Sequence, residues 1–262
     1  MLLLSVSAAG MAQDDSNKAK VNIGADIMSR YVWRGTDFGA SPSIQPTFSV
    51  SKGAFEIGYW GAYATNSDYT ETDLYLKANV GSFSLMISDY FIPSGANDFV
   101  DSRYFFFSNK NEINIDPATG SPTDQYTVHA LEGAISFNGT DKIPISLLVG
   151  TFFYGNDKIA EDTVFVDGAI SKINFKNQYS TYVELGYSFS VGENDVDLFL
   201  GMTPSASIYS TPLYSGDFAV VNCGISGARN IKITDNFDLP LKASIIANPQ
   251  ASTIFFVFGI TL

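Results

Sequence analysis

Residues 179–191, YSTYVELGYSFSV, alternate between two kinds of side chain at almost every position. One side carries Tyr179, Thr181, Val183, Leu185, Tyr187, Phe189 and Val191, and the other carries Ser180, Tyr182, Glu184, Gly186, Ser188 and Ser190. Because successive side chains of a β-strand point to opposite faces, this pattern predicts a strand with one apolar and one polar face. A soluble barrel hides its apolar face, whereas a barrel in a lipid bilayer displays it.

Segments of this kind recur along the chain from Val21 onward. The twelve predicted strands are 21–34, 43–51, 54–65, 70–81, 82–93, 125–138, 143–155, 178–192, 194–205, 217–230, 237–248 and 252–262. Sustained helical periodicity is absent, and no linker rich in Pro, Gly or Ser divides the chain. The sequence therefore predicts one all-β domain, a single antiparallel barrel of about 12 strands.

The connections between these strands alternate in length. Short ones with turn-forming residues are expected at 51–53, 81–82, 138–141, 192–194 and 234–236, and longer ones at 35–42, 65–70, 94–124, 156–177, 206–216 and 248–251. Short turns on one rim and longer loops on the other are typical of outer-membrane barrels.

Composition decides which face is expected to point outward. Charged residues make up 16% of the chain, against about 25% in an ordinary soluble domain. The alternative is a secreted soluble β protein. Its polar face would be exposed to water and rich in Lys and Glu, but the polar face of this chain carries Ser, Gly, Asn, Thr and Tyr. Beyond the first residues there is no run of ~18 apolar residues, so only strands, and not a helix, could cross a membrane. We expect the apolar face, for example Leu198 and Leu200, to meet lipid.

The two ends of the sequence carry targeting features. MLLLSVSAAGMAQDD predicts a signal peptide and leader over residues 1–20, with cleavage near Ala12, ahead of an outer-membrane barrel over 21–262. The final strand, TIFFVFGITL, resembles the assembly signal of outer-membrane proteins, although Leu262 stands where Phe is usual. The expected partners are outer-membrane lipid and lipopolysaccharide, the outer-membrane assembly machinery and small solutes.

Charge and residue counts exclude several classes of function. A net charge of −12 argues against nucleic acid, which needs clustered Lys and Arg. Cys223, the single cysteine, cannot form an internal disulfide. One histidine and one cysteine give no metal cluster, and no phosphate-binding glycine pattern is present, so no cofactor is expected.

Four motifs in the first third of the chain carry a family resemblance. They are SRYVWRGTDFGASPSIQPTF at 29–48, GYWGAYATN at 58–66, ETDLYL at 71–76 and SDYFIPSG at 88–95. Together they resemble the TorF-family porins, most clearly over residues 21–95. The resemblance implies an outer-membrane location and passive transport.

With the apolar face outside, the other face of each strand lines the lumen. The predicted pore-lining residues are Asp26, Arg30, Arg34, Glu56, Trp60, Glu71, Asp73, Tyr75, Lys77, Glu132, Tyr182, Glu184, Asp195, Asp197 and Lys242. Arg30 and Arg34 are expected on the first strand, within pairing reach of Asp26, Glu56, Glu71 and Asp73. Such charges either line a narrow conducting pore or form an ion-pair network that fills the barrel.

Two functions therefore compete. The first is a passive, porin-like channel for small hydrophilic solutes in the outer membrane of a Gram-negative cell. The second is a non-conducting barrel that acts through its loops as an adhesin, receptor or structural protein. Segment 94–124 would constrict the pore if it folded inward, or bind a partner if it stood outward.

An enzyme is not expected. A Ser-His hydrolase would need His129, but the stretch YTVHALEG offers no partner motif, and strand parity places His129 with Leu131 near the loop end. Asp89 shares parity with Ile87, which would turn its carboxylate toward lipid. Either a bulge or the headgroup zone accommodates it, or the predicted register slips there.

Overall fold

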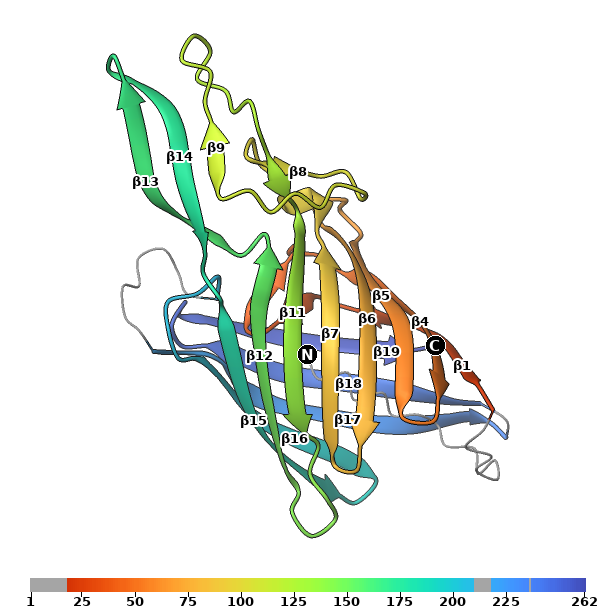
Figure 1. Ribbon diagram of the computed structural model, residues 1–262. Helices are drawn as coiled ribbons and strands as arrows, with labels where there is room; N and C mark the ends of the chain where they lie inside the picture. Colours follow the sequence, from red (N-terminus) through yellow and green to blue (C-terminus); the bar gives the residue numbers. More distant parts are fainter. Residues whose placement is uncertain (1–17, 210–217, 236) are drawn as a thin grey trace.

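The chain forms a closed antiparallel barrel of twelve strands, which confirms the predicted fold class (Figure 1). The structure is a computed structural model that describes residues 18–209, 218–235 and 237–262. The expected signal peptide, with its cleavage near Ala12, lies almost wholly outside the described residues. Within those residues, no helix is long and apolar enough to cross a membrane.

The barrel strands agree closely with the predicted segments. They are β1 (Lys20–Met28), β4 (Ser43–Lys52), β5 (Phe55–Ala64), β6 (Thr70–Val80), β7 (Phe83–Phe91), β11 (His129–Phe137), β12 (Ile145–Gly155), β15 (Thr181–Val191), β16 (Asn194–Thr203), β17 (Ala219–Thr234), β18 (Phe237–Asn248) and β19 (Thr253–Thr261). Each strand pairs antiparallel with the next barrel strand along the chain, and β1 closes the ring against β19.

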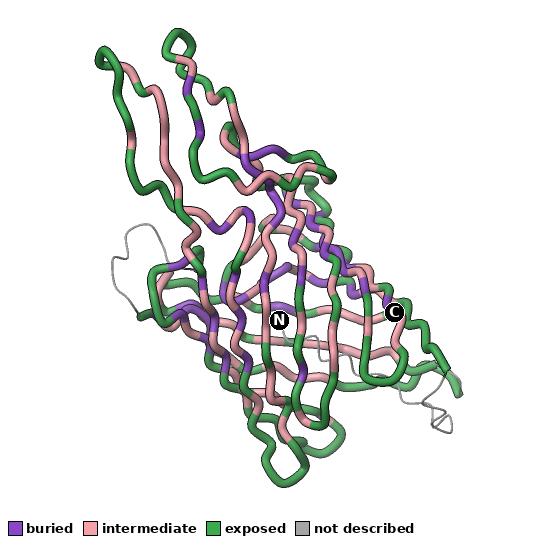
Figure 2. The backbone as a smooth tube through the Cα atoms, in the orientation of Figure 1, coloured by how far each residue is buried: buried purple, intermediate pink, exposed green. Residues whose placement is uncertain are grey.

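The two faces of the wall differ in chemistry. Large apolar side chains such as Ile23, Ile57 and Phe256 are exposed on the outer face, with exposed fractions of 79%, 62% and 65%. Carboxylates, hydroxyls and amides occupy the alternate, inner positions. Figure 2 shows that buried residues concentrate in the half of the barrel near the long loops, whereas the ends near the short turns are exposed.

Segment 94–124, together with the loop between β12 and β15, stands beyond the long-loop rim and not in the lumen (Figure 1). There β9 (Glu112–Asn114), β13 (Lys158–Val166) and β14 (Ala169–Asn177) form a three-stranded sheet, here named the blade. β8 (Val100–Asp101) pairs in parallel with β10 (Tyr126–Thr127) at its base. A short 3-10 turn, η1 (Pro93–Gly95), leads into this region.

The prediction that the first strand runs to residue 34 is wrong. β1 ends at Met28, and the chain turns back as a hairpin of β2 (Tyr31–Trp33) and β3 (Thr36–Phe38), here named the lumen hairpin. Its two-residue turn is Arg34-Gly35, with φ of 49° and 79°. Two positive φ values in a two-residue turn are the pattern of type I′, which matches the twist of paired strands.

The lumen hairpin crosses the inside of the barrel, because it contacts inner-face residues of strands on opposite sides. Tyr31 packs on Trp60 of β5 with ring centroids 5.2 Å apart, and Trp33 packs on Tyr90 of β7 at 5.5 Å. On the far wall, Asn248 of β18 donates an amide hydrogen bond of 3.3 Å to the Gly35 carbonyl. The constriction therefore comes from the loop between β1 and β4.

The position of the lumen hairpin can be tested by substituting two glycines that occupy equivalent turns. Gly35 and Gly168 both occupy the second position of a two-residue hairpin turn, with φ of 79° and 81°. A Cβ at Gly35 would lie 1.8 Å from the Val221 carbonyl oxygen, whereas a Cβ at Gly168, in the blade, would meet nothing within 4 Å.

We expect Gly168→Ala to cost about 1 kcal/mol, because it adds only the left-handed backbone penalty. Gly35→Ala should cost a further ~1–3 kcal/mol because backbone must move to relieve the clash. Urea unfolding of the refolded protein in detergent micelles measures both. Equal midpoints for the two variants would mean that the hairpin is not seated against β17.

Candidate functional site

Arg34, at the tip of the lumen hairpin, forms a buried ion pair with Glu132 on the inner face of β11. Its two terminal nitrogens donate to both carboxylate oxygens, Nη1 to Oε1 at 2.6 Å and Nη2 to Oε2 at 2.9 Å. The exposed fractions of the two side chains are 4% and 1%. A two-pronged guanidinium-carboxylate contact of this kind fixes orientation as well as distance.

Aromatic rings surround the same guanidinium. The Arg34 Cζ lies 4.4 Å from the Trp33 ring centroid, 4.5 Å from that of Tyr182 and 5.3 Å from that of Tyr209. Arg34 also donates to the Tyr209 hydroxyl, and the Tyr90 hydroxyl donates to Glu132 Oε2 at 3.0 Å. We name Trp33, Tyr90, Glu132, Tyr182 and Tyr209 the guanidinium box.

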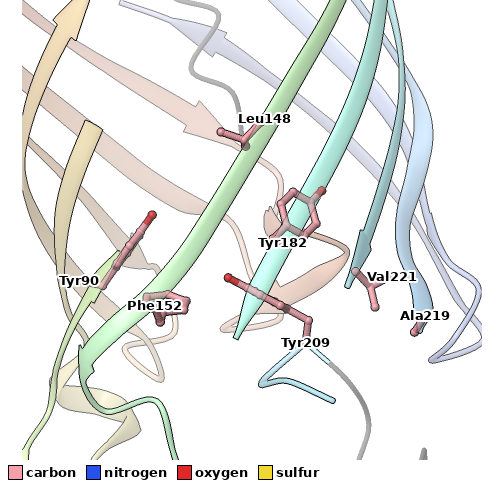
Figure 3. Packing of buried hydrophobic residues seen from close by; sticks show 7 residues of the cluster. All are labelled: Tyr90, Leu148, Phe152, Tyr182, Tyr209, Ala219 and Val221. Atoms are coloured by element: carbon pink, nitrogen blue, oxygen red, sulfur yellow. The ribbon is translucent and has the colours of Figure 1, made fainter. Parts of the chain in front are cut away.

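The walls of the guanidinium box come from separate parts of the fold. Tyr90 lies on β7, Glu132 on β11 and Tyr182 on β15, all at the ends nearest the long loops, while Tyr209 belongs to the loop after β16. Figure 3 shows Tyr90, Phe152, Tyr182 and Tyr209 turned into one shared space. Arg34 itself has a positive φ, a conformation that costs a non-glycine residue of order 1 kcal/mol. The ion pair and the stacked rings hold it there.

A second cluster packs beside the first, around Tyr31 of the lumen hairpin. Tyr31, Trp60 and Tyr69 form an aromatic group with Ala62 and Ala64. The Tyr69 hydroxyl donates to Glu71 Oε2 at 2.8 Å, and both Glu71 and Asp73 are buried. The predicted residues Trp60, Glu71 and Asp73 are thus brought together, but with tyrosines and not with arginine.

The expected pairing of Arg30 and Arg34 with Asp26, Glu56, Glu71 and Asp73 is wrong. Arg34 reaches Glu132, and Arg30 pairs with Asp37 inside the lumen hairpin. The physical reason is the fold-back after Met28, which carries both arginines off the wall. Two of these carboxylates are bound by side chains of the barrel wall. Lys242 donates to Asp26 at 2.9 Å, and Tyr75 donates to Glu56 at 2.7 Å.

The remaining predicted residues lie along the inner wall. Tyr182 donates to Glu184, which also accepts from Asn222 at 3.1 Å. Asp197 and Asp195 accept from Ser188 and Ser190, at 2.5 Å and 3.1 Å. Lys77 is the register partner of Glu56 on β5.

Several members of the guanidinium box were not among the predicted residues. Tyr90 shares inner-face parity with Ser84 and Ser88, so its position could have been read from the alternation. Trp33 was assigned to a strand that does not extend that far. Tyr209 lies in a loop, where no periodicity marks the direction of a side chain.

A cavity occupies the opposite end of the lumen, near the short turns. Its volume is about 690 Å³. Its walls are mainly β16, β17 and β18, with Asp195, Lys232, Asp238 and Lys242 among the lining residues. The lumen therefore has a packed half that holds the arginine and an open half lined by charges of both signs.

Asp89 and His129 meet on the outer wall near the long-loop rim. The Asp89 carboxylate lies 2.8 Å from His129 Nδ1, and the Tyr104 carbonyl lies 2.7 Å from Nε2. Phe107 stacks on the imidazole with centroids 4.3 Å apart. β7 runs past Asp89 without a register shift, so neither a bulge nor a slip of the register lies there, and the loop over residues 104–107 covers the pair.

No protein-family model and no curated protein matches this chain. Across the described residues, no group of three or more His, Cys, Asp or Glu side chains is placed to hold a metal ion.

The two arginines of the lumen hairpin provide a test of the buried pair. Arg34→Ala leaves the Glu132 carboxylate buried without its counter-charge, so we expect a loss of ~3–5 kcal/mol in unfolding free energy. Arg30→Ala should cost less, about 1–2 kcal/mol, because the Arg30 side chain is 41% exposed and its removal lets water reach Asp37, whose side chain is 10% exposed. Unfolding midpoints in micelles decide the matter. Equal losses would show that the Glu132 contact does not fasten the hairpin.

Proposed function

We propose that this protein is an outer-membrane β-barrel of a Gram-negative cell, and that its lumen is a narrow passive channel for small hydrophilic solutes. The lumen hairpin is its constriction. The observation that carries the proposal is the inverted wall, with apolar side chains exposed outside and charged or hydrogen-bonding side chains inside.

The membrane part of the proposal is supported by the outer face. Exposed Val, Ile, Leu and Phe side chains recur on neighbouring barrel strands, and most of these strands are 9 to 12 residues long. Strands of ~9–11 residues span a bilayer when tilted, and closure satisfies their backbone groups without water. A soluble protein rarely exposes so continuous an apolar surface.

The channel part is supported by the inner face and the cavity. A wall lined by Asp26, Glu56, Asp195 and Lys242 suits water and small polar solutes better than hydrocarbon. The half near the short turns already has room for them. The other half is narrowed by a loop hairpin, which can move without breaking the pairing of any barrel strand. The resemblance to TorF-family porins agrees with passive transport.

The second candidate is a non-conducting barrel that acts through its loops. The blade favours it, because β9, β13 and β14 stand beyond the rim (Figure 1) and expose Phe165 and Val166 near their tip. The buried Arg34-Glu132 pair favours it too, since the pair and the rings around it lie inside the barrel and are closed off from water. The two candidates differ in one measurable property, which is ion flow through the barrel.

The membrane location has its own test, with a matched control. Leu198 points outward, and Ser226 is the inner-face register partner of Asp197. Leu198→Arg should cost ~2–4 kcal/mol or block assembly, if that residue meets the bilayer midplane. Ser226→Arg should assemble normally because it places a cation beside a carboxylate. Heat-modifiable mobility of the membrane fraction reports assembly, and equal tolerance of both changes would argue for a soluble barrel.

The channel is tested by single-channel recording in planar bilayers. Met28 and Ser43 are register partners, so a short Gly-Ser turn can replace the residues between them. We expect small conductance steps from the native protein and steps several-fold larger from this variant, because the constriction is gone. Replacing blade residues 164–171 by a similar turn should leave conductance unchanged. Correctly refolded native and hairpin-free proteins that both fail to conduct would favour the second candidate.

A further inference from the structure

The guanidinium box has the parts of a binding site for a guanidinium ion. A carboxylate meets the planar fork in two contacts, and the rings of Trp33 and Tyr182 lie 4.4 Å and 4.5 Å from the central carbon. Two-pronged carboxylate contact combined with aromatic stacking discriminates a guanidinium from a compact ammonium. Glu132 and Tyr182 are both almost fully buried, so this recognition operates away from bulk water.

The present occupant of the box belongs to a loop, while most of the box belongs to the wall. Tyr90, Glu132 and Tyr182 are fixed by barrel strands β7, β11 and β15. Arg34 arrives from the lumen hairpin with a left-handed backbone. If the hairpin withdraws, Trp33 leaves with Arg34, while the carboxylate, the Tyr182 ring and the Tyr90 hydroxyl stay in place. Arg34 is therefore positioned as an intramolecular ligand of a site that remains in the wall when Arg34 leaves.

The fit of Arg34 is also incomplete. Its Nε is buried and has no hydrogen-bond partner among the described residues. Leaving a buried donor unpaired is unfavourable. A free guanidinium compound is not tied to the hairpin backbone, so it can turn within the box and direct that donor to an acceptor or to water.

A run of carboxylates connects the open end of the lumen to this box. Asp195 lines the cavity near the short turns, Asp197 follows it on the inner face of β16, and Glu184 comes next on β15 beside Tyr182. The other inner-face positions of these two strands are Gly186, Ser188, Ser190, Phe199, Gly201 and Thr203. No inner-face position of β15 or β16 is cationic, so this side of the lumen favours an approaching cation.

We propose that the guanidinium box is a binding site for solutes that carry a guanidinium group, and that Arg34 occupies it in competition with them. The part of this proposal that concerns which solutes pass through the barrel rests on the proposed channel function. The part that concerns binding depends on the guanidinium box alone. Solute binding and withdrawal of the lumen hairpin are then coupled, because both cations need the same carboxylate.

The test empties the box and refills it with a small molecule. Arg34→Ala removes the atoms that ethylguanidinium supplies, and Trp33, one of the two tryptophans of the chain, reports on occupancy by fluorescence. In refolded Arg34→Ala protein in micelles, we expect millimolar ethylguanidinium to cause a saturable fluorescence change and to raise the unfolding midpoint. Ethylammonium, with equal charge and no fork, should bind at least tenfold more weakly.

Two further proteins control this result. Arg34→Ala combined with Glu132→Gln should lose the saturable change, and the native protein should bind at least tenfold more weakly than Arg34→Ala because the solute must displace Arg34. If Arg34→Ala refolds poorly, ethylguanidinium added during refolding should restore the yield and ethylammonium should not. Absence of both saturable binding and rescue, or equal effects of the two cations, would overturn the proposal. Because the readout needs no ion flow, a barrel that binds ethylguanidinium but never conducts would reject the channel and keep the site.

Discussion

An open twelve-stranded sheet would leave two strand edges unpaired, so the seam between β1 and β19 is the contact on which the rest of the barrel depends. The seam is short. Three register pairs join the strands, Asp26 with Thr261, Ile27 with Ile260 and Met28 with Gly259, and Ala25 and Leu262 exchange two further backbone hydrogen bonds. On its other edge, β1 pairs with β4 over all nine of its residues.

The lumen hairpin is fastened to the inner side of this seam and then to the opposite wall. Met28 and Val32 pack against Val257 of β19, so the hairpin begins where the barrel closes. Its tip then reaches Glu132. Burying two charges costs several kcal/mol of solvation per ion, which only good geometry recovers. Here the two-pronged contact, the Tyr90 hydroxyl and the stacked rings supply that geometry. One loop therefore braces the seam and closes half of the lumen.

The sequence predicts the wall well and the loops poorly, for a physical reason. Alternation reports which face of a strand is buried, so segment 237–248 was predicted with its observed bounds and Glu132 and Tyr182 were placed on the inner face. Alternation continues from β1 through Tyr31 and Trp33 without revealing that the chain reverses. The turn Arg34-Gly35 lacks the Asn or Asp that usually marks a type I′ hairpin. Arg34 contacts Glu132, 98 positions away, because of where the lumen hairpin lies in the folded barrel. No local sequence pattern predicts that position.

The packed half of the lumen buries polar atoms that have no hydrogen-bond partner among the described residues. They include Arg34 Nε, Asp73 Oδ1 and Asn222 Oδ1. Buried polar atoms without protein partners need water or a solute, and each costs ~1–3 kcal/mol when neither is supplied. A barrel closed for good would be more stable with apolar side chains at these positions. Under the proposed channel function, withdrawal of the lumen hairpin would place Arg34 and Glu132 in water, so the solvation cost of burying these two charges would favour opening.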